Sequence, residues 1–195
     1  MSKKNLPENF YERIKPQLQR RIGRELRLAG RILDLGCGSC ELDRYLVDTY
    51  HQKVTGVDIV SANFPKHRRS RSGQRFHCIC QDAAHLKSIR DGAVDAVVTM
   101  EALHEMKRPK AILVEANRVL RPGGKILVVD FPRGSLAQRL WDENYYSPTE
   151  IGRMLKQAGF VEVRVKTIER GQLMWGTGYR PCCESSRHKE MENRA

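Results

Sequence analysis

Residues 32–42, which read ILDLGCGSCEL, constrain the fold more than any other stretch of the chain. The first four residues predict a short buried strand, and Gly36 and Gly38 predict a tight turn after it. From Glu41 onward, apolar residues recur with helical spacing. A strand that turns at glycines into a helix presents backbone N–H groups at the positive end of the helix dipole, and glycine lets a ligand approach them closely. The stretch therefore predicts a ligand pocket.

Strands and helices alternate along the rest of the chain. Helices are expected over residues 8–29, from 41, from about 61, over 109–120 and over 147–158. Strands are expected over residues 32–35, 53–59, 75–80, 94–100, 125–131, 160–168 and 173–179. Pro16 falls inside the first helical pattern and predicts a break or kink there. The order of elements predicts an α/β fold, with a doubly wound, mostly parallel seven-stranded sheet and helices on both faces.

Composition indicates a globular protein, and its length of 195 residues fits one domain. Hydrophobic residues make up 40% of the chain, yet no apolar run approaches the roughly 20 residues that cross a bilayer. Residues 1–15 lack the apolar segment of a secretory signal, so we expect a cytoplasmic protein without a transmembrane segment.

The net charge of +12 is large for this length and unevenly spread. Basic residues fill the predicted N-terminal helix, and a second cluster contains Lys66, Arg68, Arg69, Arg71 and Arg75. Charge of this kind attracts anions, including nucleic acid, anionic lipid and phosphorylated metabolites. A solvated face that keeps the protein soluble explains it equally well.

The six cysteines fall in three pairs: Cys37 and Cys40, Cys78 and Cys80, Cys182 and Cys183. Without an export signal we expect reduced thiols that pack as small buried apolar groups, and no metal. A zinc site is the less favoured alternative, because its spacing matches no common zinc pattern. Its ligands would be His77, Cys78, Cys80 and the Cys182–Cys183 pair.

Acidic residues occur where the predicted parallel strands end. Asp58, Asp82 and Asp130 end or follow strands, and Asp34 lies within the first one. Ligands bind at the carboxyl ends of such strands, and carboxylates there suit hydroxyls, amines or positive charge. A dinucleotide-binding turn would place its third glycine at Glu41, where an acid would face the pyrophosphate. An adenosine-methionine ligand fits better, because it carries a sulfonium cation and no phosphate.

Four segments in order resemble motifs of the class I S-adenosylmethionine-dependent methyltransferases. They are ILDLGCGSCEL, VTGVDI, QDAAHLKSIRDGAVDAVVTMEALHEM and RVLRPGGKILVVDF, within residues 30–131. The pattern is most similar to the small-molecule branch that includes quinone-biosynthesis methyltransferases. The resemblance implies a Rossmann-like fold, with S-adenosyl-L-methionine as cofactor and S-adenosyl-L-homocysteine as product.

The resemblance also implies roles for individual residues. The methionine portion of the cofactor would contact Asp34, Gly36, Cys37 and Gly38. Asp58 would accept hydrogen bonds from the ribose hydroxyls, and Ile59 would pack on the adenine. Asp82 would bind the adenine amino group, and Ala83 the ring edge through its backbone. Met100 and Glu101 would line the cofactor near its reactive methyl. The family commonly has a third glycine where this chain has Cys40.

Methyl transfer is an in-line displacement that needs no protein nucleophile, so holding the acceptor in a water-poor cavity supplies much of the rate. A hydroxyl or carbon acceptor would need a general base, for which His104, Glu101 and a tyrosine of residues 145–146 are candidates. A purely structural role for His104 remains the alternative. No Asn/Asp-Pro-Pro-Tyr motif follows the fourth strand, where residues 99–102 read TMEA, and this disfavours methylation of exocyclic base amines.

The resemblance divides the chain into four parts. Residues 1–30 form an N-terminal helical segment, 31–131 the cofactor-binding core, 132–180 the acceptor side with the closing strands, and 181–195 a loose tail. The aromatic residues Trp141, Tyr145 and Tyr146 form an acceptor wall or anchor their segment on the core. We expect a small-molecule methyltransferase; the alternatives are an RNA or protein methyltransferase that uses the basic patches, and a non-catalytic cofactor-binding protein.

Overall fold

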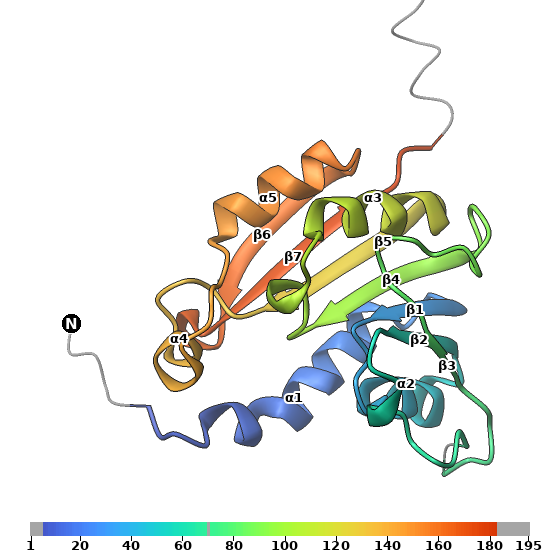
Figure 1. Ribbon diagram of the computed structural model, residues 1–195, viewed down its shortest axis with the longest axis horizontal. Helices are drawn as coiled ribbons and strands as arrows, with labels where there is room; N and C mark the ends of the chain where they lie inside the picture. The colour runs from blue at the N-terminus through green and yellow to red at the C-terminus, as the bar shows by residue number, and fades with distance from the viewer. Residues whose placement is uncertain (1–5, 70, 183–195) are drawn as a thin grey trace, which may run out of the picture.

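One sheet contains all seven strands of the computed structural model, which describes residues 6–69 and 71–182 (Figure 1). Its strand order is β3-β2-β1-β4-β5-β7-β6, and β7 alone runs antiparallel to its neighbours. The strands are β1 (Arg31–Leu35), β2 (Lys53–Asp58), β3 (His77–Cys80), β4 (Val94–Met100), β5 (Leu120–Asp130), β6 (Val161–Ile168) and β7 (Leu173–Tyr179). The predicted Rossmann-like, mostly parallel sheet is confirmed.

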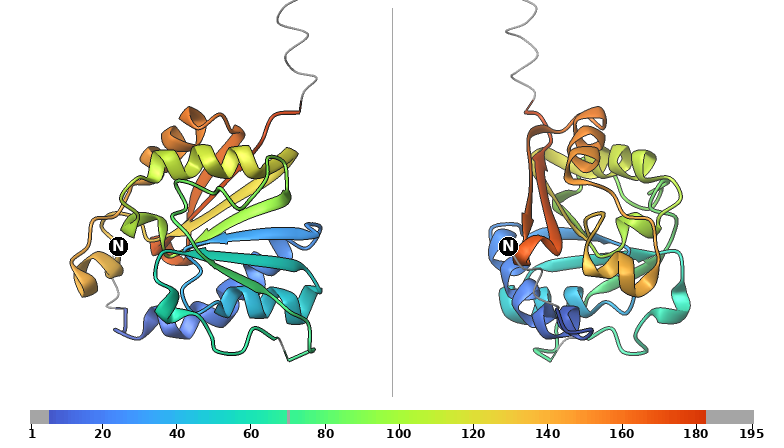
Figure 2. Two further views of the ribbon diagram at one scale, coloured as in Figure 1. Left: turned by 45° about the vertical axis from the view of Figure 1, so that its right-hand side comes forward. Right: turned by 90° about the vertical axis from the view of Figure 1, so that its left-hand side faces the viewer.

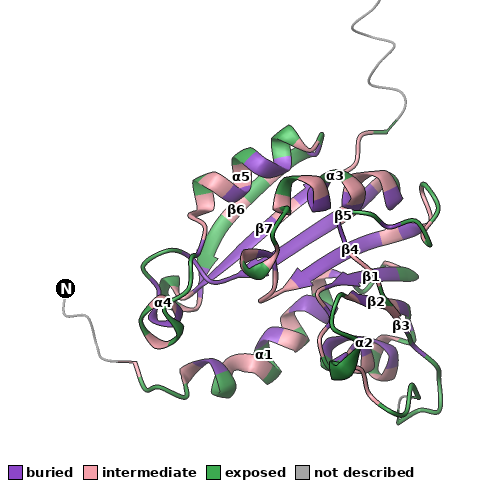
Figure 3. Ribbon diagram, in the orientation of Figure 1, coloured by how far each residue is buried: buried purple, intermediate pink, exposed green. Residues whose placement is uncertain are grey.

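Helices cover both faces of the sheet, as predicted (Figure 2). One face packs against α1 (Phe10–Glu25), α2 (Glu41–Tyr50) and α4 (Leu136–Trp141). The other packs against α3 (Pro109–Val119) and α5 (Pro148–Gln157). Neighbouring strand residues alternate between the two cores, so the central strands are buried on both sides (Figure 3).

Pro16 does not break the N-terminal helix, which runs without interruption from Phe10 to Glu25. The prediction of a break at this residue is therefore wrong. Leu18 and Ile22, in the half of the helix after Pro16, are buried in the core beneath the sheet. Their burial outweighs the one hydrogen bond that proline removes.

The helix expected from about residue 61 is only a single 3₁₀ turn, η1 (Ser61–Asn63). Pro65 follows almost at once, and the basic residues after it offer no apolar stripe with which a helix could pack. Conversely, α4 lies in a segment for which no helix was predicted. Among the described residues, no helix is both long enough and apolar enough to pass through a membrane.

Candidate functional site

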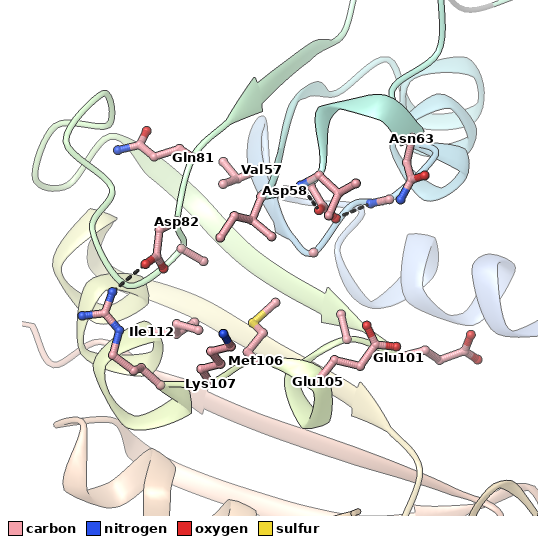
Figure 4. A pocket seen from close by; sticks show the side chains of 17 residues that line it. Val57, Asp58, Asn63, Gln81, Asp82, Glu101, Glu105, Met106, Lys107 and Ile112 are labelled. Atoms are coloured by element: carbon pink, nitrogen blue, oxygen red, sulfur yellow. Dashed lines mark hydrogen bonds and ion pairs between the residues drawn. The ribbon is translucent and has the colours of Figure 1, made fainter. Parts of the chain in front are cut away.

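A cavity of about 550 Å³ lies at the carboxyl ends of β1, β2, β3 and β4 (Figure 4). Its volume is typical of sites that hold a small molecule or cofactor. Of the predicted binding residues, those that line it are Gly36, Gly38, Asp58, Ile59, Asp82, Ala83 and Glu101. Asp34, Cys37 and Met100 do not line it: the first two are buried behind the turn, and Met100 packs against the core. The four strand ends therefore bring most of the predicted site together.

The glycine turn is fixed against both the cavity wall and β2. Gly36 has a φ of +76°, and a Cβ there would lie 2.5 Å from the Cβ of Ala102. Its N–H donates to the carbonyl of Val57 at 2.8 Å. The N–H of Gly38 donates to Asp58 Oδ2 at 2.9 Å. Only glycine fits at position 36, because the side chains of Ala102 and Met106 occupy the space that a Cβ would need.

Asp58 is held at the end of β2 with both carboxylate oxygens oriented. Oδ2 accepts from Gly38, and Oδ1 accepts from the N–H of Val60 at 2.9 Å. Each carboxylate oxygen can accept a second hydrogen bond, so Asp58 can still bind a pair of hydroxyls. The next residue, Ile59, lines the cavity with its side chain exposed, where a flat apolar ring could cover it.

Asp82 pairs across the cavity wall with Arg108, a residue that sequence reasoning missed. Oδ1 accepts from the N–H of Ala84 at 2.8 Å, and Arg108 Nη2 donates to Oδ2 at 2.5 Å. The Ala84 hydrogen bond and, after it, Arg108 hold the pKa of Asp82 below its ordinary value. Arg108 directly precedes α3, and no sequence spacing links it to the end of β3. Asp82 is therefore a fixed carboxylate.

Glu101 follows β4 in a left-handed backbone conformation, with a φ of +55°. Its N–H donates to the carbonyl of Val129 at 2.7 Å, which anchors it to β5. Burial raises the pKa of Glu101 to about 7, and the carboxylate of Asp130 adds to this, while Lys15 and His104 oppose it. The side chain can therefore exchange a proton near neutral pH.

His104 is held between two acidic side chains and does not line the cavity. Its Nδ1 lies 2.7 Å from Asp130 Oδ1, and its Nε2 lies 3.0 Å from Glu143 Oε2. Only 3% of the side chain is exposed. Burial lowers the pKa of His104, but hydrogen bonding to Asp130 and the nearby carboxylates more than offset this, so the pKa is raised overall. Both ring nitrogens are thus engaged.

Aromatic rings from α1, from α4 and from the residue that follows β5 meet beside His104. The ring centroids of Tyr11 and Phe131 lie 4.7 Å apart, and those of Tyr11 and Trp141 5.4 Å apart. Tyr145 is buried against His104, with 4.5 Å between centroids, so it anchors its segment. Trp141 is 47% exposed and remains available as a wall. Tyr146, by contrast, packs against the core on the other face.

The residues of the less favoured zinc set do not come together. Cys78 is buried in the core, whereas Cys80 on the same strand is exposed. Cys182 lies beside Gly123 of β5, and three strands separate β5 from β3. Cys183 lies outside the described residues. That ligand set is therefore ruled out for the described cysteines and His77.

A family model described as a methyltransferase domain matches residues 33–128. An O-methyltransferase of Penicillium expansum is 26% identical over 89% of this chain and 65% of its own length. A ubiquinone biosynthesis O-methyltransferase of Chromobacterium violaceum is 26% identical over 82% of this chain and 73% of its own. The structure of a SAM-dependent methyltransferase from Archaeoglobus fulgidus has a TM-score of 0.68 and 17% identity, over 87% of this chain and 97% of that one.

The chain spans between 30% and 65% of the length of the first curated relatives it matches. The matched region nevertheless contains the glycine turn, Asp58, Asp82 and Glu101, which together form the cavity. The sequence motifs, the sheet order and the cavity agree with this methyltransferase domain, and the chain is similar to the class I S-adenosylmethionine-dependent methyltransferases.

Proposed function

We propose that this chain binds S-adenosylmethionine in the strand-end cavity and transfers its methyl group to a small-molecule acceptor, with S-adenosylhomocysteine as product. The observation that carries the proposal is that one cavity is lined by the Gly36 turn, Asp58 and Asp82. Asp58 keeps acceptor capacity for two hydroxyls, and Ile59 offers an apolar surface for a base. Gly36 lets the turn pack against Ala102 and Met106 at the cavity wall, and the acceptor capacity of Asp58 beside it fits the ribose of the cofactor.

Asp82 and Ala83 would hold the adenine, with Arg108 fixing the carboxylate of Asp82. The backbone at Gly36 and Gly38 would receive the methionine portion. Asp34 and Cys37 lie behind the turn, so we assign them to supporting it rather than to touching the ligand. Met100 would support the end of β4 in the same way.

The bound cofactor supplies a methyl group on a positively charged sulfur, which an acceptor displaces in line. Glu101 is the better placed general base, because it lines the cavity and its pKa is raised to about 7. Its ionised form would take the acceptor's proton. His104 lies just beyond, held by Asp130, and would orient the acceptor side of the cavity. Exclusion of water by the buried wall favours the transfer.

Calorimetry with S-adenosylhomocysteine tests the cofactor site. We expect wild type to bind, and Asp58→Ala to weaken binding by about 5- to 150-fold, the equivalent of about 1–3 kcal/mol for unpaired polar partners. Asp91→Ala is the control, because Asp91 lies outside the cavity and its side chain is 74% exposed. Absence of binding to wild type would refute the proposal.

Incubation with methyl-labelled cofactor and fractionated cell extract tests the acceptor class. Label should enter small molecules. Label in RNA or protein would support the macromolecular alternative, which the basic surface keeps open. Cofactor binding without any transfer would support a non-catalytic binding protein. If the His104→Ala enzyme keeps full turnover, His104 has no role on the acceptor side of the cavity.

A further inference from the structure

Three thiols from two distant segments converge behind the glycine turn. Cys37 and Cys40 come from the turn between β1 and α2, and Cys78 comes from β3. The sulfur of Cys40 lies 3.6 Å from that of Cys37 and 2.8 Å from that of Cys78. All three residues are buried, and none of them lines the cofactor cavity.

Asp43, one turn into α2, adds a carboxylate to this group. One of its oxygens and the sulfur atoms of Cys37 and Cys40 all lie within 4.8 Å of one another. The residue is 0% exposed, and both of its oxygens lack a hydrogen-bond partner among the described residues. A buried carboxylate without a donor is costly, so the Asp43 carboxylate needs either a proton shared with Asp34 or a bound cation.

The sheet leaves room for these groups and for little else. Gly56 of β2 lies beneath them, and a Cβ there would be 2.6 Å from Cys37 Sγ and closer still to Asp43 Oδ2. A methyl group at this position would therefore displace both side chains. The absence of a side chain at Gly56 is what allows the thiol and the carboxylate to meet.

Without a metal ion, no single arrangement accounts for all four side chains, and two would have to be combined. Neutral thiols could pack as small apolar groups, but Asp43 would stay unpartnered. A disulfide between Cys40 and Cys78 would leave Cys37 and Asp43 as they are. A proton shared between Asp43 and the neighbouring Asp34, which also has an oxygen without a partner, would satisfy the carboxylates, and the metal content distinguishes this arrangement from a bound ion.

We propose that Cys37, Cys40, Asp43 and Cys78 bind one zinc ion. Cys37 and Cys40 have the Cys-x-x-Cys spacing of structural zinc sites, and Asp43 follows three residues later. Tetrahedral zinc with bonds of about 2.3 Å holds thiolate sulfurs about 3.8 Å apart, close to the Cys37–Cys40 distance. Cys78 Sγ lies outside the group within 4.8 Å, so it would move away from Cys40 and adjust its position relative to Cys37 and Asp43 as well. Three thiolates select zinc over magnesium or calcium.

The ion would be structural, because four protein ligands leave no open position. It would join the cofactor turn to β3 and neutralise the carboxylate of Asp43. This site replaces the expectation that the thiols are only small buried groups. It does not depend on the proposed methyl transfer, since its occupancy is measured directly.

Metal content of the purified full-length protein tests the proposal. We expect about one zinc ion per chain by mass spectrometry after dialysis against metal-free buffer. Replacement of zinc by cobalt(II) should give thiolate-to-cobalt charge-transfer absorption and the strong visible bands of a tetrahedral site. Both measurements use wild type, so they stand even if variants fail to fold. Zinc far below one per chain, together with no cobalt–thiolate absorption, would overturn the proposal.

Variants identify the ligands. Cys40→Ser and Asp43→Asn should each lower the zinc content several-fold, whereas Asp43→Cys should retain zinc and strengthen the cobalt charge-transfer band. Cys80→Ser is the matched control, because Cys80 lies on the same strand as Cys78 but is exposed. Its zinc content should equal that of wild type. A metal-free wild type in which peptide mapping finds Cys40 joined to Cys78 would show a disulfide instead.

Discussion

Cys40 holds a backbone conformation that residues with a side chain rarely adopt. It caps α2 with φ and ψ of 56° and 34°, in the left-handed region. This conformation costs a non-glycine residue about 1–2 kcal/mol. Here the thiol lies between those of Cys37 and Cys78. The resemblance to the family showed only that Cys40 stands where a glycine is common. The contacts of its sulfur with those of Cys37 and Cys78 give a physical reason for a cysteine at this position.

Residues whose partners are distant in sequence were the hardest to predict. Asp58 and Asp82 were found because each follows a strand, and strand ends meet at one edge. Arg108 was not found, since its partner Asp82 comes from another element and only the folded sheet brings them close; Asp43 is near Cys40 in sequence, but its burial shows only in the structure. Local pattern therefore predicted Asp58, Asp82 and Glu101 of the cavity, but not Arg108 or the buried carboxylate of Asp43.

Glu101 makes stability depend on pH. Its folded pKa of about 7 exceeds the unfolded value of 4.5, so the folded state retains a proton that the unfolded state has lost. Stability from this group is complete below pH 4.5 and is lost as pH rises through 7. Between pH 5 and pH 8, wild type should lose about 2–3 kcal/mol more than Glu101→Gln, whose side chain does not titrate.

Urea unfolding of both proteins at the two pH values measures this difference. Glu12→Gln is the control, because Glu12 is exposed on α1, and it should follow wild type at both pH values. Equal losses in wild type and Glu101→Gln would show that the Glu101 carboxyl titrates near its ordinary pKa. It would then be a weaker candidate for the general base.

At the scale of elements, a capping signal predicted the start of α5 correctly, whereas a proline inside α1 predicted a break that the helix does not have. The sequence Ser-Pro-Thr-Glu at residues 147–150 predicted a helix start, and the structure contains the full capping box. Pro16 was misread because the packing of α1 on the sheet overrides a local signal. The short α4 carries too few residues for a helical period to be visible, so tertiary contacts alone define it.

The capping box of α5 should have a measurable effect on stability. Ser147 Oγ accepts from the N–H of Glu150, and Glu150 Oε2 accepts from the N–H of Ser147 at 2.7 Å. Ser147→Ala removes the first bond and should lower the free energy of unfolding by about 1 kcal/mol. Thr149→Ala is the control, because Thr149 is exposed in the same turn and makes no cap. Urea unfolding curves compare them, and equal midpoints would contradict the prediction.

At the scale of the whole molecule, the basic cluster after η1 and the cavity are formed by different residues. The cluster of Lys66, Arg68, Arg69, Arg71 and Arg75 is exposed in the chain between η1 and β3 and lines no part of the cavity. The cavity itself is lined by four acids, Asp58, Asp82, Glu101 and Glu105. Lys107 and Arg108 also line the cavity, but the four acids outnumber them, so an RNA chain attracted to the cluster would meet net negative charge where methyl transfer is proposed.

Binding to RNA should therefore be electrostatic and separate from catalysis. If the five cluster residues each contact a phosphate of single-stranded RNA, affinity should fall roughly 100-fold between about 50 and 200 mM salt. Replacing all five with glutamine should remove most of that salt dependence while leaving label transfer to small molecules unchanged, because the cluster lies outside the cavity. Filter binding across salt concentrations measures the affinity for RNA and its salt dependence. The labelled-cofactor assay measures label transfer to small molecules. Label in RNA that disappears in the glutamine variant would show instead that the basic cluster delivers RNA to the cavity, since only a substrate-binding role would couple the two measurements.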